Sequence, residues 1–160
     1  MKPILDMCCG GRMFWFDKAN PLVVFQDKRR EFFQFKNSGQ KSGFQSYRVE
    51  PDVLGDFTEM AFADESFHLV VFDPPHLLAS KGTGGWLRQK YGTLNDWQET
   101  LRKGFSEAFR VLKPNGTLIF KWASTEIPVS EIVRLSPIPP LFGNVSGKKS
   151  HVHWIVFIKV

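Results

Sequence analysis

Short apolar runs that lead to an aspartate recur along the first half of this chain. The runs have the length of β-strands, and the acids that follow them are Asp6, Asp27, Asp56 and Asp73. Continuous apolar runs are typical of parallel strands that are buried on both faces. Ligands of open parallel sheets bind beyond the carboxyl ends of the strands, so these acids are the first candidates for a functional site.

Local patterns predict the remaining elements. Strands are expected at 3–6, 22–25, 52–56, 67–72, 117–122 and 153–160, and short helical segments at 12–16, 30–35 and 129–135. After Asn95, the expected N-cap, apolar residues recur every three or four residues as far as Leu112, which predicts an amphipathic helix that Pro114-Asn115-Gly116 stops. Strands that alternate with helices predict the α/β class: a Rossmann-like, mostly parallel sheet with helices on both faces and a C-terminal antiparallel strand.

The composition suits one compact domain spanning residues 1–160. Lysine and arginine outnumber aspartate and glutamate by 21 to 16, and the net charge of +5 favours an anionic partner such as nucleic acid, although it also fits solubility alone. Cys8 and Cys9 are adjacent, which gives neither a metal-ligand spacing nor a long-loop disulfide, so we expect reduced thiols and no metal. No apolar run approaches a membrane span and no signal peptide opens the chain, so we expect a soluble, cytoplasmic protein without a membrane partner.

A small-residue turn follows the first strand. Together with the order of the strand-end acids, Leu5-Asp6-Met7-Cys8-Cys9-Gly10-Gly11 resembles the first motif of class I methyltransferases that depend on S-adenosylmethionine. That resemblance implies that Asp6, Cys8, Gly10 and Gly11 contact the cofactor, whose methionine part approaches the turn. Cys8 replaces the usual first glycine, and Arg12 stands where a third glycine is common. A glycine turn alone is equally compatible with a strand-to-helix turn that holds no ligand.

Two further acids complete the expected cofactor site. Asp27 follows the second strand at about the separation at which nucleotide-binding folds place an acid for the ribose hydroxyls, although an exposed strand-end acid is the alternative. The resemblance implies that Asp56 receives the adenine amino group and that Phe57 contacts the same base. The stretch 110–120 resembles the helix-turn-strand that follows the catalytic strand in this family, with Asn115 in a left-handed turn position.

The tetrad Asp73-Pro74-Pro75-His76 ends the strand at 67–72. It resembles the Asp-Pro-Pro-aromatic motif of the amino-methyltransferase branch, which modifies base or glutamine nitrogens. The resemblance implies that Asp73 and the carbonyl of Pro74 accept the two N–H bonds of a target amine, while consecutive prolines hold the backbone extended. His76 stands where a larger aromatic residue is usual, and a plain strand-terminating turn is the alternative reading of the tetrad.

A basic and aromatic loop lies between the tetrad and the amphipathic helix. Its candidate substrate-binding residues are Lys81, Trp86, Arg88, Lys90 and Tyr91. Such a loop could clamp phosphates and stack on bases, but it also fits a lid over a small substrate or a surface loop anchored by one tryptophan. A second basic patch comprises Lys148, Lys149, His151 and His153, for which a solvated charge run is the simpler interpretation.

These residues together predict an S-adenosylmethionine-dependent methyltransferase that acts on an exocyclic amino nitrogen of a base in DNA or RNA. Two alternatives remain open on the same fold. One is a methyltransferase of small-molecule or protein amines, which needs no separate recognition domain. The other is a non-catalytic module that binds cofactor or nucleic acid, an alternative raised by Cys8, Arg12 and His76.

Overall fold

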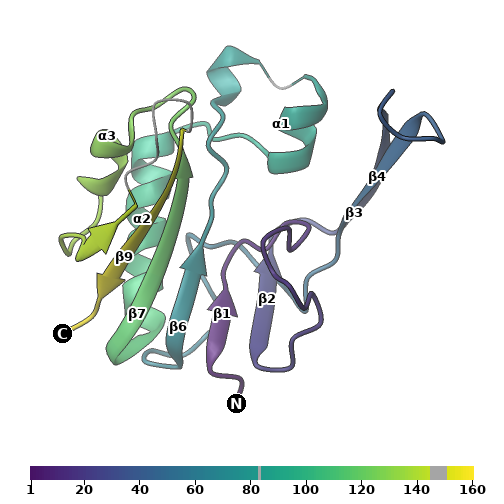
Figure 1. Cartoon of the computed structure of the whole chain (residues 1–160). Coiled ribbons are helices and arrows are strands. Elements are labelled where there is room, and N and C mark those ends of the chain that lie inside the picture. The colour runs from purple at the N-terminus through teal and green to yellow at the C-terminus, as the bar shows by residue number, and fades with distance from the viewer. Residues whose placement is uncertain (83, 145–150) are drawn as a thin grey trace.

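The computed structural model describes residues 1–82, 84–144 and 151–160. Seven strands form one sheet in the order β5-β2-β1-β6-β7-β9-β8, and Figure 1 shows β2, β1, β6, β7 and β9 side by side. Their bounds are Ile4–Asp6 (β1), Val23–Asp27 (β2), Val53–Leu54 (β5), Phe67–Phe72 (β6), Leu112–Ala123 (β7), Phe142–Gly143 (β8) and Val152–Ile158 (β9). Strands β5, β2, β1, β6 and β7 run parallel, whereas β9 is antiparallel to β7 and β8 is antiparallel to β9. The predicted fold class, a mostly parallel α/β sheet with an antiparallel C-terminal strand, is confirmed.

The described helices are η1 (Ala79–Lys81), α1 (Trp86–Tyr91), α2 (Trp97–Val111) and α3 (Val129–Val133). The predicted amphipathic helix is α2, and its N-cap is Asp96, one residue after the expected Asn95, because the Asp96 side chain accepts the N–H of Glu99. The helix ends at Val111, before the proline, and the chain passes directly into β7. Asn115 has φ 63°, so the expected left-handed conformation is confirmed. None of the described helices is long and apolar enough to cross a membrane.

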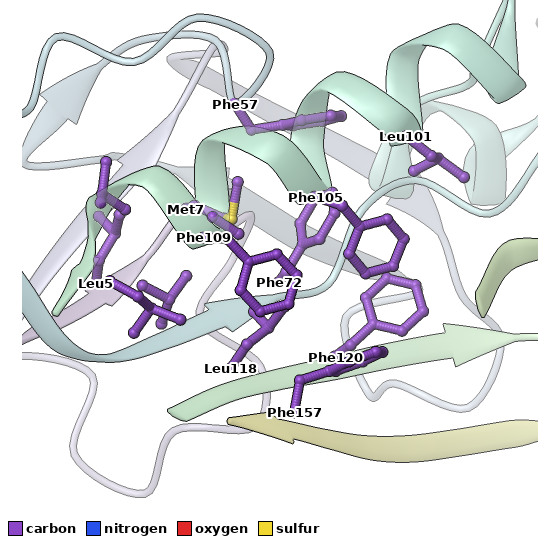
Figure 2. Packing of buried hydrophobic residues seen from close by; sticks show 14 of the residues in the cluster. Leu5, Met7, Phe57, Phe72, Leu101, Phe105, Phe109, Leu118, Phe120 and Phe157 are labelled. Atoms are coloured by element: carbon purple, nitrogen blue, oxygen red, sulfur yellow. The ribbon is translucent and has the colours of Figure 1, made fainter. Parts of the chain in front are cut away.

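The core lies between α2 and the sheet (Figure 2). Phe105 of α2 packs against Phe72 of β6 and Phe120 of β7, with ring centroids 5.6 and 4.9 Å apart. Gly104 brings the helix close to the sheet, because a Cβ at this position would lie 2.5 Å from the Phe72 ring. Tight aromatic packing therefore fixes β6, whose carboxyl end carries the Asp-Pro-Pro-His tetrad.

The face opposite α2 is covered differently. Ile4, Val23 and Phe25 form a second cluster there with Trp15, whose ring meets Phe25 edge-on at 5.4 Å. The segment 12–16 forms turns, so the predicted short helix is wrong. Two of its aromatic side chains pack against the sheet individually, Trp15 against Phe25 and Phe14 edge-on against Trp154 of β9, whereas Phe16 is exposed.

A β-hairpin of β3 (Glu31–Lys36) and β4 (Phe44–Val49) stands apart from the main sheet, beside β2 (Figure 1). The helical turns predicted at 30–35 are therefore wrong, and residues 37–43 form the turn that joins the two strands. Phenylalanine and tyrosine favour strands, and the cross-strand pair of Phe33 and Tyr47 has ring centroids 5.3 Å apart. The hairpin reaches α1 through Phe35, which stacks on Trp86 at 5.0 Å.

Candidate functional site

The strand order reverses direction between β1 and β6. From β1 the chain proceeds outward to β2 and β5, and it then returns to place β6 and β7 on the other side of β1. In open parallel sheets the crevice at such a switch point, beyond the carboxyl ends of the strands, is where ligands bind. Asp6, Asp27 and Asp73 all lie at this edge, at the ends of β1, β2 and β6.

A cavity of about 280 Å³ opens at this edge. Its walls contain most of the residues singled out from the sequence, namely Cys8, Gly10, Gly11, Asp27, Phe57, Asp73, Pro74, Pro75, His76, Lys90 and Tyr91. Segments that are far apart in the sequence therefore meet at one site: the glycine turn, the end of β2, the tetrad and the end of α1.

Asp27 is 5% exposed and anchors the glycine turn. One carboxylate oxygen accepts the N–H of Gly10 at 2.8 Å, and the other accepts the N–H of Arg29 at 2.9 Å and pairs with its guanidinium at 3.4 Å. A carboxylate offers about four acceptor positions. Asp27 is therefore a buried carboxylate fixed by these contacts, not the exposed strand-end acid of the alternative interpretation. It can still accept a hydrogen bond from a ligand hydroxyl.

Tyr47 of β4 lies directly on the glycine turn. Its hydroxyl accepts the N–H of Gly11 at 2.7 Å, and a Cβ at Gly11 would lie 2.6 Å from the Tyr47 ring, so only glycine fits there. Burial raises the pKa of the Tyr47 phenol. Arg12, the departure from the third glycine, has φ 55°, the left-handed conformation that glycine adopts most readily. Its guanidinium lies 3.8 Å from the centre of the Phe25 ring, which gives this arginine a local packing role.

Asp6 lies beneath the turn and does not line the cavity. It is fully buried, where it accepts the indole N–H of Trp15 at 2.7 Å and the N–H of Cys8 at 3.4 Å. Burial, with smaller contributions from the charges of Asp73 and Asp27, raises the pKa of Asp6 to about 7. The predicted direct cofactor contact of Asp6 is therefore corrected to a role in holding the turn from below.

The two cysteines are free. Burial raises the pKa of Cys9 to about 12 and the pKa of Cys8 well above its usual range, and nearby carboxylates add to both shifts. Thiols with raised pKa values are poor nucleophiles at neutral pH. Cys8 therefore contributes to the cavity wall as a small apolar group.

Asp73 is paired with a lysine that sequence reasoning missed. The ammonium of Lys121, on the neighbouring strand β7, lies 2.9 Å from Oδ2 of Asp73. Burial raises the pKa of Asp73, and the positive charge of Lys121 opposes that shift. A charged residue inside the apolar run 117–122 was the available signal, because lysine in a buried strand requires a partner.

His76 and Tyr91 form the aromatic side of the cavity. Their ring centroids lie 5.4 Å apart, and the His76 ring also meets Trp122 edge-on at 6.3 Å. Burial, with a smaller effect from the charge of Lys121, lowers the pKa of His76. The imidazole is therefore neutral at pH 7 and can face a planar ligand without a charge.

Several predicted site residues lie outside the cavity. Asp56 lies beyond the end of β5 in an exposed turn, where its carboxylate accepts the N–H and hydroxyl of Thr58, so the predicted strand ran two residues too far. Lys81 is exposed, and Trp86 is occupied by its stack on the hairpin. Arg88 pairs with Glu126 at 2.6 Å. The contacts of Trp86 and Arg88 therefore fix these two side chains outside the cavity.

The second basic patch is only partly described. His151 and His153 precede and belong to β9, respectively, and neither lines the cavity. Lys148 and Lys149 lie outside the described residues.

The comparisons with known proteins bear on the fold. No family model matches the chain, and no curated protein matches it. The solved structure of a SAM-dependent methyltransferase from Methanosarcina mazei is similar to it with a TM-score of 0.58 and 14% identity, over 100% of this chain and 94% of that one. A SAM-dependent methyltransferase from Aquifex aeolicus is similar with a TM-score of 0.53 and 13% identity, over 99% and 82% of the two chains. The chain has a methyltransferase-like fold.

The residues of the cavity fit S-adenosylmethionine, and the contacts that they offer come from side chains rather than from free backbone amides. The amides of Gly10 and Gly11 are already bonded to Asp27 and Tyr47, so the turn offers close approach rather than free donors. Asp27 would accept the ribose hydroxyls, and Phe57 would supply an apolar wall. Asp73 lines the same cavity.

Proposed function

We propose that this protein is an S-adenosylmethionine-dependent methyltransferase that methylates an exocyclic amino nitrogen of a base in DNA or RNA. One observation carries the proposal: the tetrad from Asp73 to His76 lines the same switch-point cavity as the glycine turn and Asp27. The net charge of +5 is consistent with a nucleic-acid substrate.

The bound cofactor would supply an electrophilic methyl group on a sulfonium. The lone pair of an exocyclic base amine is delocalised into the ring, so the site must localise that lone pair on the nitrogen. Asp73 and the carbonyl of Pro74 would each accept one N–H of the amine and so orient the lone pair. Because proline lacks an N–H and fixes φ, the Pro74-Pro75 step holds its carbonyl without a local donor.

Lys121 supports this role of Asp73. It binds Oδ2 at 2.9 Å, and within the described residues no group binds Oδ1. One oxygen is therefore fixed while the other remains available to the amine. The positive charge also favours the carboxylate form, the only form of Asp73 in which both oxygens accept hydrogen bonds. Catalysis would then depend on positioning and fixed electrostatics.

The aromatic side of the cavity would hold the ring of the base. His76 is neutral at pH 7 and lies beside Tyr91, so a planar group could stack there. A base within a duplex cannot reach such a recess, so the target would be flipped out or already unpaired.

The experiment that tests this function is transfer of a radiolabelled methyl group from S-adenosylmethionine to DNA and RNA, followed by digestion to nucleosides. The wild type is compared with Asp73→Ala and with the control Asp56→Ala, whose carboxylate is exposed and outside the cavity. We expect labelled amino-methylated nucleosides from the wild type and the control, and a loss of at least about 100-fold with Asp73→Ala.

Other outcomes would redirect the proposal. Label found only in small-molecule or protein amines would move the substrate to that class. A folded wild type that binds cofactor but methylates no nucleophile would support the non-catalytic module.

A further inference from the structure

Lys90, near the end of α1, is buried in the wall of the cavity. Only 7% of its surface is exposed, an unusual value for lysine. Its backbone is held from below, because the guanidinium of Arg29 donates to the carbonyls of Gln89 and Lys90 at 3.1 and 3.2 Å. Since Arg29 also pairs with Asp27, the end of α1 is fixed over the end of β2.

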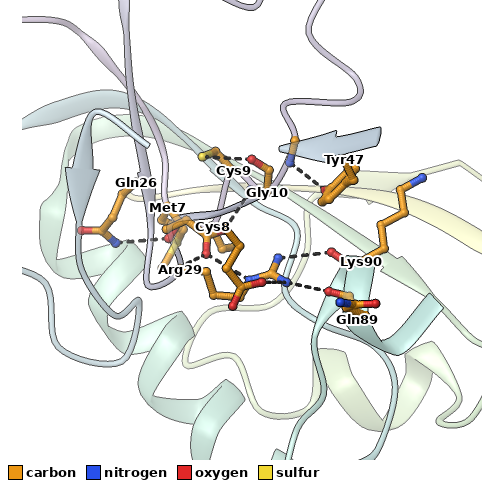
Figure 3. Close-up of polar contacts among 12 residues, drawn as sticks. Met7, Cys8, Cys9, Gly10, Gln26, Arg29, Tyr47, Gln89 and Lys90 are labelled. Carbon is orange, nitrogen blue, oxygen red and sulfur yellow. Dashed lines mark hydrogen bonds and ion pairs between the residues drawn. The ribbon is translucent and has the colours of Figure 1, made fainter. Parts of the chain in front are cut away.

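The ammonium of Lys90 has aromatic neighbours and, among residues 1–82, 84–144 and 151–160, no anionic partner. It lies 5.1 Å from the centre of the Tyr91 ring, 5.4 Å from that of Tyr47 and 5.9 Å from that of Trp86. Within the described residues it makes no ion pair and donates no hydrogen bond, and in Figure 3 the Lys90 side chain extends alongside Tyr47 while the marked hydrogen bond ends at its backbone carbonyl. Cation-π contacts recover only part of the hydration that a buried ammonium loses.

The charges of the cavity wall do not balance. Four cations and two carboxylates line it: Lys28, Arg29, Lys90, Lys121, Asp27 and Asp73. The charges of both carboxylates are already paired with other cations, Asp27 with Arg29 and Asp73 with Lys121. The cavity therefore holds a buried positive charge that none of the described acids of its wall neutralises.

We propose that Lys90 is the receptor for an anionic group of the ligand, bound between the glycine turn and the aromatic side of the cavity. Tyr47 contacts the turn, and Tyr91 lies beside His76, so an ammonium flanked by both tyrosines lies between these two parts of the site. The anion is a carboxylate or a phosphate. Resting on the proposed function, these two correspond to the amino-acid end of the cofactor and to the backbone of the nucleic acid.

The test uses three variants and three probes. Lys90→Gln removes the charge, Lys90→Arg keeps it, and Lys103→Gln removes a charge from an exposed lysine of α2. The probes are S-adenosylhomocysteine, which carries the carboxylate, 5′-methylthioadenosine, which lacks it, and a single-stranded oligonucleotide. Calorimetry measures the binding of the two nucleosides, and fluorescence anisotropy measures the binding of the oligonucleotide.

If Lys90 binds the carboxylate, Lys90→Gln should weaken the binding of S-adenosylhomocysteine roughly 10- to 100-fold and leave the binding of methylthioadenosine unchanged. If Lys90 binds a phosphate instead, the substitution should weaken the binding of the oligonucleotide by a similar factor and leave the binding of both nucleosides unchanged. Lys90→Arg should recover most of the affinity in either case, and Lys103→Gln should change neither.

Two results would overturn the proposal: no dependence of any probe on Lys90, or equal weakening of both nucleosides, which would show that Lys90 only shapes the cavity. A wild type that binds neither nucleoside would instead refute the proposed function, and the oligonucleotide titration would still decide whether Lys90 receives an anion.

Discussion

Replacing Asp6 with asparagine should remove a large part of the pH dependence of stability. The pKa of Asp6 is about 7 in the folded protein against 3.8 for the ordinary group, and the residue is fully buried. Because the folded value is raised, the stabilisation is present at low pH and is lost as the pH rises from about 4 to about 7. The whole shift corresponds to about 4 kcal/mol, of which about 2.5 kcal/mol falls between pH 5 and pH 8.

The assay is urea unfolding of the wild type and Asp6→Asn from pH 5 to pH 8. The asparagine oxygen can still accept the indole N–H of Trp15, and only the long contact from Cys8 is lost. The free energy of unfolding of the variant should gain about 2.5 kcal/mol on that of the wild type across this interval. Asp56→Asn, at an exposed carboxylate, should show no such gain. A constant difference between wild type and Asp6→Asn would refute the reasoning.

Two further changes probe the core and the site. Gly104→Ala should lower the free energy of unfolding by about 1 to 3 kcal/mol in urea titrations, because its Cβ would overlap the Phe72 ring. The control Gly84→Ala, with open space around it, should change that free energy by no more than about 0.5 kcal/mol. Equal effects of the two substitutions would contradict the packing described. Lys121→Met removes the charge that opposes the raised pKa of Asp73, so the acid limb of the methyl-transfer pH profile should move to higher pH. An unshifted profile would show that Lys121 does not act through Asp73.

The sheet could be predicted from the sequence because a strand that is buried on both faces is a continuous apolar run. Each inner parallel strand is an apolar run, and its order along the chain suffices to expect an α/β fold. The hairpin of β3 and β4 could not be predicted in this way. More than half of the residues of its strands are exposed, so neither strand is an apolar run, and pairing with the partner strand decides their conformation.

Some residues of the candidate site could likewise be predicted from the sequence, and others could not. Asp27 and Asp73 could be found because they end strands, and strand ends meet at one edge of a parallel sheet. Tyr47 and Lys121 could not be assigned roles, since each acts on a residue far away in the sequence: Tyr47 on Gly11, 36 positions earlier, and Lys121 on Asp73, 48 positions earlier. Such roles arise only when the chain has folded.

The central claim is that the switch-point cavity is a cofactor site, and calorimetric titration with S-adenosylhomocysteine tests it most directly. We predict saturable binding to the wild type, at least about 10-fold weaker binding to Asp27→Ala, and unchanged binding to Asp56→Ala. The first acid lies in the cavity wall and the second lies outside it. Absence of binding to folded wild type, or equal weakening by both substitutions, would contradict the account.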